Sequence, residues 1–291
     1  MNERAATRLT SDRAVLVAFL AIALVLRLPG HLNSGLWFDE IWMLVESVRV
    51  PFTSLFTTFE SDNNHPLYSI LTWPGVRLFG EHAWTLRLPA VLFGVASIGM
   101  MWTFARLVTD RAEAALATAL LTVSYHHVWF SQNARGYTML LFWTLAATYF
   151  LLKTYAGGAR RDWVMYALCL ALATYTHASA VFVAIGHAGV AFLSLVASRV
   201  APTRGAESES REARWAPLLG VALAGVLSLG LHAGMLGDML AFFTQDAAPA
   251  AAGTNEMNPN TPSEWTTIWW TLSAVVNSLG VPAPLAWGGL A

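Results

Sequence analysis

Long apolar stretches separated by short polar segments recur along the chain of 291 residues. An α-helix needs about 20 predominantly apolar residues to cross a bilayer. We therefore expect an all-α fold, a polytopic transmembrane helical bundle of about eight spans. The expected spans cover residues 14–28, 88–105, 112–130, 136–152, 163–178, 179–197, 215–236 and one segment within 265–291.

The segment between the first two spans, residues 31–87, is expected to be a large outer loop. Within it, Leu67–Phe79 is apolar enough to suggest a span, but it is short and Pro74-Gly75 interrupts it. Counting it as a span would invert every later loop and place the basic clusters outside. We therefore interpret it as a juxtamembrane or re-entrant segment.

The distribution of basic residues predicts the orientation of the chain. With the N-terminus in the cytoplasm, twelve of the 17 Lys and Arg residues fall on the inner side, and the outer loop 237–264 has none. The basic start followed by an apolar run is typical of a retained signal-anchor. Residues 201–214 are polar and mixed in charge, which predicts a cytoplasmic linker, and 246–262 are predicted to form a mobile outer loop.

Composition excludes several classes of protein. The chain is 56% hydrophobic and 12% charged, with a mean hydropathy of +0.50, whereas charged residues make up about a quarter of a soluble domain. A net charge of -1 without a basic block argues against nucleic acid as a partner. The single cysteine, Cys169, lies in an apolar run and excludes an intrachain disulfide framework.

An acidic pair, Asp39-Glu40, follows the first span within the motif LWFDE. Apolar residues after it recur at helical spacing, which predicts a helix along the membrane surface: Ile41, Leu44, Val45 and Val48. One interpretation is structural: Asp39 caps this helix and Glu40 interacts favourably with its dipole. The other is catalytic, because a carboxylate held by backbone N–H groups stays ionised and oriented, as a general base must be.

Polar residues gather in three further outer segments. His65 is followed by a proline and preceded by three polar residues, so it is either a structural hydrogen-bonding group or part of a binding site. Arg87 and Arg135 lie outside, against the topological bias. Each is either an interfacial arginine that extends toward the headgroups or a fork that binds phosphate. His177 follows the fifth span, and no His/Cys/Asp group has the spacing of a metal site.

Together these segments resemble the GT-C membrane glycosyltransferases, in particular the branch of the protein O-mannosyltransferases and lipid A aminoarabinose transferases. The resemblance covers roughly residues 15–200. The matching segments, in order, are LRLPG at 26–30, LWFDE at 36–40, NHPLYSIL at 64–71, RLFGEHAWTLRLPAVLFG at 77–94, FSQNARGYTMLLF at 130–142 and YTHASAVFVA at 175–184.

The resemblance implies a transmembrane catalytic module over residues 1–200, followed after the linker by further spans over 215–291. It implies transfer of a sugar from a polyprenyl-phosphate donor to an acceptor protein, lipid or glycan at the outer membrane face. Asp39 would act as general base or position the acceptor, and Glu40 would support it. The acids could serve with or without a divalent cation.

In the same resemblance, His65, Tyr137 and His177 would line the substrate pocket. Arg87 and Arg135 are the candidates for the lipid phosphate, on grounds of charge and topology more than of motif. Some relatives carry an acidic residue in the second outer turn, where this chain has Asn133 and Tyr137, so a second catalytic carboxylate is missing there.

Two alternatives stay open at this point. One is a transporter or flippase for a lipid-linked sugar, which should place polar residues near the bilayer midplane and on interrupted helices. The other is an inactive, truncated homologue, since family members are usually longer than this chain.

Overall fold

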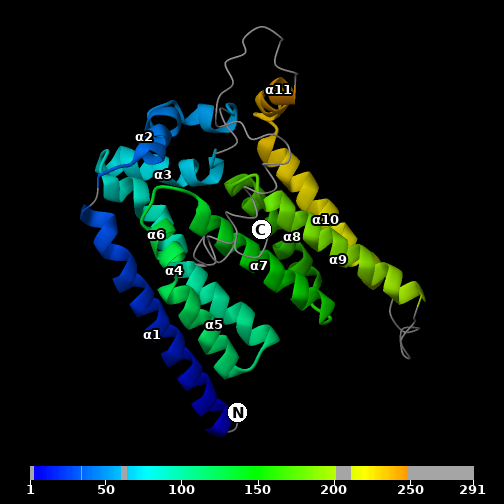
Figure 1. Cartoon of the computed structure of the whole chain (residues 1–291). Helices are drawn as coiled ribbons and strands as arrows, with labels where there is room; N and C mark the ends of the chain where they lie inside the picture. Colours follow the sequence, from blue (N-terminus) through cyan, green and yellow to red (C-terminus); the bar gives the residue numbers. More distant parts are fainter. Residues whose placement is uncertain (1–2, 34, 60–63, 201–210, 248–291) are drawn as a thin grey trace, which may run out of the picture. The chain divides into compact units, whose positions relative to one another are not determined.

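The computed structural model describes residues 3–33, 35–59, 64–200 and 211–247. These residues form helices and no strands, which confirms the predicted all-α fold for this part of the chain. The chain divides into two units, residues 1–243 and 244–291. In chain order the helices are α1 (Glu3–Asn33), α2 (Phe38–Met43), the π-helical turn η1 (Leu44–Val48), the 3₁₀ turn η2 (Phe52–Phe56), α3 (Pro66–Phe79), α4 (Ala83–Val108), α5 (Arg111–Val123), α6 (Tyr125–Ser131), α7 (Tyr137–Tyr155), α8 (Arg160–Thr176), α9 (Ala180–Val200), α10 (Arg211–His232) and α11 (Leu236–Ala247) (Figure 1).

Among the described residues, three segments are long and apolar enough to cross a membrane: Ala83–Val108, Ala180–Ala197 and Trp215–His232. The predicted number of about eight spans is therefore not confirmed. The span predicted within 265–291 lies outside the described residues. Leu67–Phe79 belongs to a separate helix of 14 residues, α3, which contains Pro74.

Several predicted boundaries differ from the structure. The single span expected over 112–130 is two helices, α5 and α6, because the chain turns at Ser124. The Ser124 hydroxyl accepts a hydrogen bond from the backbone N–H of His127, and a serine favours such a helix start over a helix interior. The predicted linker 201–214 ends in helix, since α10 begins at Arg211, and α11 covers the first part of the predicted loop 237–264.

Helix α4 organises the N-terminal half of this unit. It packs against α1, α3, α5, α6 and α7, and α8 in turn packs against α7 and α10 (Figure 1). Small residues at the contacts of α7 and α8, among them Ala146, Ala147 and Ala167, are fully or almost fully buried and allow the two helices to approach closely.

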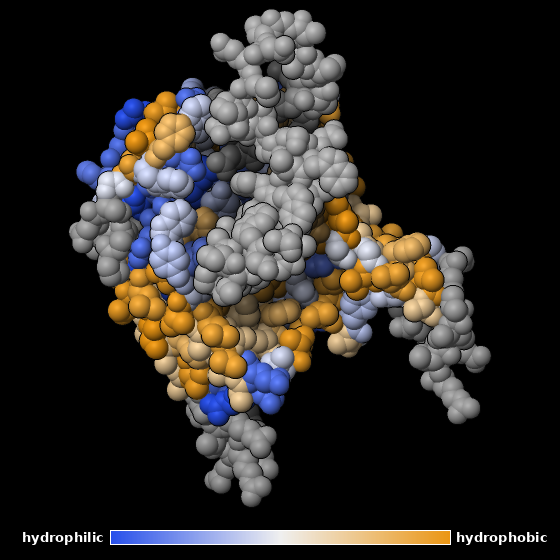
Figure 2. Space-filling model, viewed as in Figure 1, coloured by the Kyte–Doolittle hydropathy of each residue, from blue (hydrophilic) through white to orange (hydrophobic). Residues whose placement is uncertain are grey.

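Large apolar side chains also cover much of the outer surface, as a membrane protein requires. Residues such as Phe182, Ile185 and Val226 are exposed. Figure 2 shows apolar side chains spread over the helices, and hydrophilic ones gathered where α2 and α3 lie. Contiguous exposed apolar surface of this extent is rare on soluble monomers and is expected where lipid is the solvent.

A buried arginine joins α1 to the α5–α6 corner. Arg27 is fully buried, and its Nη2 lies 2.7 Å from Nδ1 of His127. Its Nε donates to the hydroxyl oxygen of Ser131 at 3.1 Å, and Nη1 donates to the carbonyl oxygen of Ala23 at 2.9 Å. Because these hydrogen bonds are made inside the helix bundle, they fix the position of α1.

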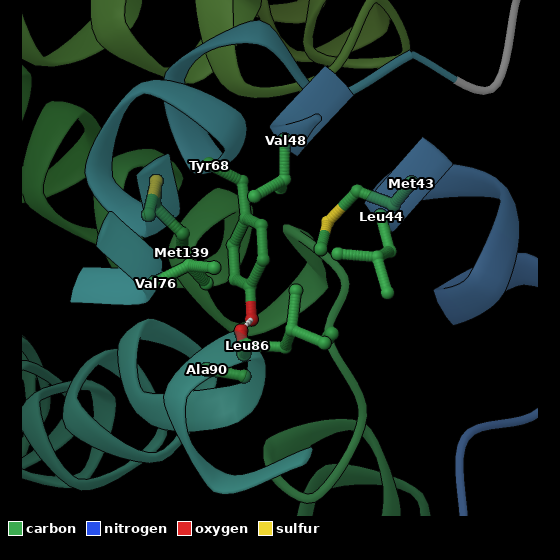
Figure 3. Close-up of a cluster of buried hydrophobic side chains, with 9 residues drawn as sticks. Met43, Leu44, Val48, Tyr68, Val76, Leu86, Ala90 and Met139 are labelled. Atoms are coloured by element: carbon green, nitrogen blue, oxygen red, sulfur yellow. Dashed lines mark hydrogen bonds between the residues drawn. The ribbon is translucent and has the colours of Figure 1, made fainter. Parts of the chain in front are cut away.

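The segment between α1 and α4 is held to the bundle by a buried apolar cluster. Figure 3 shows Met43, Leu44 and Val48 of this segment facing Tyr68 and Val76 of α3, with Leu86 and Ala90 of α4 and Met139 of α7 beside them. The Tyr68 hydroxyl donates a hydrogen bond of 2.8 Å to the backbone carbonyl of Leu86, so the polar tip of this fully buried ring has a partner.

The face predicted for the helix after Glu40 is only partly observed. Leu44 and Val48 are buried as expected, but Ile41 and Val45 are exposed, and Met43 takes their place in the core. The cause is the change of helix type: the backbone N–H of Arg49 bonds to the carbonyl of Leu44, five residues back, which widens the turn.

Candidate active site

The polar groups of interest lie at one end of the helix bundle. We call it the site end and define it by residues 35–59 and 64–82, the α6–α7 turn at 132–136 and the α8–α9 turn at 177–179. These segments are far apart in the sequence. The helices that carry them pack side by side (Figure 1).

Glu40 and Arg87 form a buried ion pair at the site end. Arg87 Nε donates to Glu40 Oε1 at 2.7 Å, and Arg87 Nη2 donates to Glu40 Oε2 at 2.6 Å. The two side chains are 0% and 2% exposed, respectively. Arg87 Nη2 also donates to the carbonyl oxygen of Gly35 at 2.8 Å. This two-point geometry is the strong form of an arginine–carboxylate contact.

The Glu40 carboxylate also accepts two backbone hydrogen bonds. Oε2 accepts from the N–H of Trp37 at 3.2 Å, and Oε1 accepts from the N–H of Ala134 at 2.6 Å. Glu40 therefore ties the start of α2 to α4 and to the α6–α7 turn. We call this set of contacts the Glu40 clamp.

Asp39 lies one residue earlier, in the first turn of α2, and is half-buried. The N-cap position belongs to Trp37, and the side chain that bonds to its N–H is Glu40 rather than Asp39. The expectation that Asp39 caps the helix is therefore wrong. The reason is that α2 begins at Phe38, which places Asp39 and Glu40 at its second and third positions.

Four of the predicted substrate-binding residues come together at the site end. The ring of His65 lies 5.1 Å from that of Tyr137 and 4.8 Å from that of His177, measured between ring centroids. The guanidinium carbon of Arg135 lies 5.9 Å from the centre of the Tyr137 ring. The cluster joins the start of α3, the start of α7 and the end of α8, whereas Arg87 belongs to the Glu40 clamp.

Gly136 permits this close packing. A Cβ atom at this position would lie 2.8 Å from Nδ1 of His65 and 3.0 Å from the methyl carbon of Thr176. Both distances are at or below the closest approach that real side chains make, so a larger residue would push His65 away from the cluster.

His65 is neutral at physiological pH. Burial, followed by the Arg135 cation and then His177, holds the pKa of His65 well below its usual range. The Nδ1 atom of His177 accepts a hydrogen bond from the backbone N–H of Ser179 at 3.1 Å. A neutral imidazole carries one donor and one acceptor nitrogen, so the ring of His65 can exchange hydrogen bonds with an uncharged substrate.

A pocket of about 160 Å³ opens beside the cluster. The elements α2, η1, η2 and the start of α3 surround it, and the α6–α7 turn closes one side. Its polar lining includes Glu46, Asn64, His65, Ser69 and Arg135. Asp39 does not line this pocket, and the expected neighbours Asp62 and Asn63 lie outside the described residues.

Glu46 is the charged residue in the lining of this pocket that was not predicted from the sequence. It lies in η1, within a run that the apolar spacing marked as a membrane-surface helix. Spacing from Asp39 would not have found it, because residues 44–48 form a π-helical turn and Asp39 does not line the pocket. Among the described residues, no group of three or more His, Cys, Asp and Glu side chains could hold a metal ion.

Comparison with known proteins supports the resemblance found in the sequence. Residues 63–206, or 144 of the 291, match the family model of dolichyl-phosphate-mannose-protein mannosyltransferases. The chain is also similar in structure to the S. cerevisiae protein O-mannosyltransferase Pmt1-Pmt2 complex bound to the sugar donor. That match has a TM-score of 0.62 at 16% sequence identity and covers 81% of this chain.

The chain spans 34% of the length of the yeast protein chain that it matches. No curated protein matches the sequence significantly. At 16% identity the structural match establishes the fold. The N-terminal part of the chain is GT-C mannosyltransferase-like, and the chain is a membrane protein.

Proposed function

We propose that this protein is a glycosyltransferase that moves a sugar from a polyprenyl-phosphate donor to an acceptor at the membrane surface. The observation that carries the proposal is the cluster of His65, Arg135, Tyr137 and His177 beside a polar pocket. All four residues lie within the part of the chain, 63–206, that matches the mannosyltransferase family model. The name of that family makes mannose the first candidate for the sugar.

Arg135 is the residue that we assign to the lipid phosphate. It is buried, it lines the pocket, and its cation lies close enough to His65 to lower the pKa of that residue. Arg87, the second candidate from the sequence, already holds the Glu40 carboxylate and the Gly35 carbonyl. We therefore give Arg87 and Glu40 a positioning role in this proposal.

Asp39 is our candidate for the general base, or for the acid that positions the acceptor. In the proposed step its carboxylate takes the proton of the acceptor hydroxyl as the hydroxyl oxygen bonds to the anomeric carbon. The bond from that carbon to the phosphate oxygen breaks, and polyprenyl phosphate leaves with one more negative charge. Arg135 stabilises that developing charge.

We also propose that the site end faces outward and that the N-terminus is cytoplasmic, in line with the distribution of basic residues. Cysteines introduced at Glu81, at the site end, and at Ala156, in the turn after α7, test the orientation. Both positions are exposed, and the native Cys169 is buried. An impermeant maleimide should label Glu81→Cys in intact cells and Ala156→Cys only after permeabilisation. The reverse pattern would overturn the orientation.

The activity is tested with a transfer assay in membranes that contain the protein. Radiolabelled polyprenyl-phosphate sugars, with mannose first, are incubated with wild type, Asp39→Asn and Glu81→Gln. Loss of a general base should slow transfer by roughly 100- to 10,000-fold. Glu81→Gln, which neutralises an exposed acid of the same segment, should transfer at the wild-type rate. The proposal fails if several donors give no transfer, or if Asp39→Asn retains the full rate.

A further inference from the structure

We propose that the pocket beside Glu46 is the subsite for the sugar ring of the donor, and that Glu46 binds the ring hydroxyls. This inference rests on the proposed function, because it names the part of the donor that the pocket receives. Glu46 would also give the pocket a carboxylate, a group that the α6–α7 turn does not contain.

The lining of the pocket contains buried polar atoms that make no hydrogen bond within the described residues. By distance and angle, both ring nitrogens of His65 and the hydroxyl oxygen of Ser69 are of this kind, although the Thr176 backbone lies close enough to His65 to affect its pKa. The two residues are 2% and 1% exposed. Leaving such groups without partners is costly, and native structures keep few of them. Two such side chains in the wall of one pocket indicate a ligand that hydrogen-bonds.

The chemistry of the lining favours a polyhydroxyl group. Glu46 offers carboxylate oxygens as acceptors, Asn64 and Ser69 offer both donors and acceptors, and neutral His65 offers one of each. Trp42 adds an indole surface, which suits the apolar C–H face of a sugar ring. An apolar chain would leave these groups unpaired, and an anion would be repelled by Glu46.

The size of the pocket agrees with one ring. Its volume of about 160 Å³ is below the range of roughly 300–1,000 Å³ that drug-sized ligands occupy. Of the described residues that line the pocket, Arg135 is the one cation and Glu46 the one carboxylate. A donor with its ring toward Glu46 and its phosphate toward Arg135 places each part of the molecule beside a group of matching chemistry.

A binding experiment separates the sugar from the phosphate. Wild type, Glu46→Gln and the control Glu81→Gln are purified in detergent and titrated with two short-chain lipids: polyprenyl phosphate carrying mannose, and the same polyprenyl phosphate without the sugar. Glu46→Gln should weaken binding of the sugar-bearing lipid about 10- to 100-fold, the effect of losing one charge-assisted hydrogen bond. Binding of the bare lipid phosphate should stay equal or become tighter, because a nearby negative charge is removed.

A second variant guards against misfolding. Ser69→Ala removes a hydroxyl that has no partner within the described residues, so its melting temperature should equal or exceed that of the wild type. Its affinity for the sugar-bearing lipid should nevertheless fall. A lower melting temperature with unchanged affinity would show that Ser69 is only structural and would overturn its place in the subsite.

The remaining outcomes separate this inference from the proposed function. If wild type transfers sugar but Glu46→Gln binds both lipids as wild type does, the subsite is wrong and the function stands. If both lipids weaken equally, the pocket receives phosphate and the subsite is also wrong. If wild type transfers nothing yet discriminates the two lipids through Glu46, the subsite stands and the proposed transfer fails.

Discussion

Replacing Glu40 with glutamine keeps the shape of the side chain and removes its charge, so it isolates what the charge does in the Glu40 clamp. In Glu40→Gln, the Arg87 cation would remain buried, with its carboxylate partner replaced by a neutral amide. One of the two amide positions would be an NH₂ group, which donates rather than accepts hydrogen bonds. The backbone N–H of Ala134 or of Trp37 would then lose its acceptor.

The expected loss of unfolding free energy depends on how deeply the ion pair is buried rather than on the distance between its charged atoms. Breaking a buried ion pair by removing one charge costs about 3–5 kcal/mol. The Arg49–Glu81 pair has almost the same shortest distance, 2.7 Å against 2.6 Å, but its side chains are 55% and 43% exposed. An exposed pair contributes about 0–1 kcal/mol. Glu81→Gln is therefore a matched control for the same chemical change in water.

The assay is equilibrium unfolding of the purified protein in detergent micelles by a denaturing surfactant, followed by tryptophan fluorescence. Glu40→Gln should lower the free energy of unfolding by about 3–5 kcal/mol and Glu81→Gln by less than about 1 kcal/mol. The double variant Glu40→Leu with Arg87→Met should recover much of the loss, because an apolar pair of similar volume replaces two buried charges. Equal stability of Glu40→Gln and Glu81→Gln would refute the reasoning.

Two further predictions concern the helices themselves. A methyl group at Gly94 would overlap the hydroxyl oxygen of Ser131, so Gly94→Ala should lower the free energy of unfolding by about 1–3 kcal/mol. Gly99 is also in α4, and a Cβ there would lie 3.7 Å from its nearest neighbour, Leu20 of α1, so Gly99→Ala should unfold as wild type does in that assay. The Lys153 ammonium, which donates a 2.9 Å hydrogen bond to Asp162, holds the pKa of that carboxyl below its usual range. The stabilisation is present above the usual carboxyl pKa of about 4 and is lost as pH falls through the lowered value, so Asp162→Asn should flatten the acid side of a plot of melting temperature against pH. A slope as steep in Asp162→Asn as in wild type would contradict this assignment.

The positions of several helices were predictable from the sequence, because the length of an apolar run indicates where a helix begins and ends. The expected spans 136–152 and 163–178 differ by at most three residues from α7 and α8 at each end. The break at Ser124 was not predicted, because apolar residues resume after Ser124 and His126-His127, so that the whole stretch 112–130 was taken as one span. The π-helical turn at 44–48 was not predictable either, because no spacing of apolar residues distinguishes it from an α-helix that turns a different face inward.

Four residues of the cluster were selected from the sequence, but neither their partners nor Glu46 could be predicted from it. His65, Arg135, Tyr137 and His177 were selected because they lie in outer segments, and the fold brings them together. Arg87 was selected for the same reason, yet its partner is 47 residues away in the sequence. Charge and topology identify a cation at the membrane edge, but only packing decides whether that cation is already occupied by a carboxylate.

The acidic pair illustrates why neighbouring residues of like charge need not share a role. Successive side chains of an α-helix point about 100° apart, because a turn takes 3.6 residues. When Glu40 turns inward to meet Arg87, Asp39 must point elsewhere, and it is the less buried of the two. The pair thus separates into Glu40, which holds the fold, and Asp39, which is less buried and which we propose acts on the acceptor.

That separation determines how activity measurements on the two acids should be interpreted. The Ala134 N–H that Glu40 holds lies directly before Arg135, our candidate for the phosphate. Loss of the Glu40 charge should therefore displace Arg135 and reduce transfer even if Glu40 never touches a substrate. Loss of activity in Glu40→Gln, accompanied by lower stability, is consequently not a sign of a catalytic role. An inactive Asp39→Asn that unfolds at the wild-type surfactant concentration would be such a sign, because its loss could not be assigned to the fold.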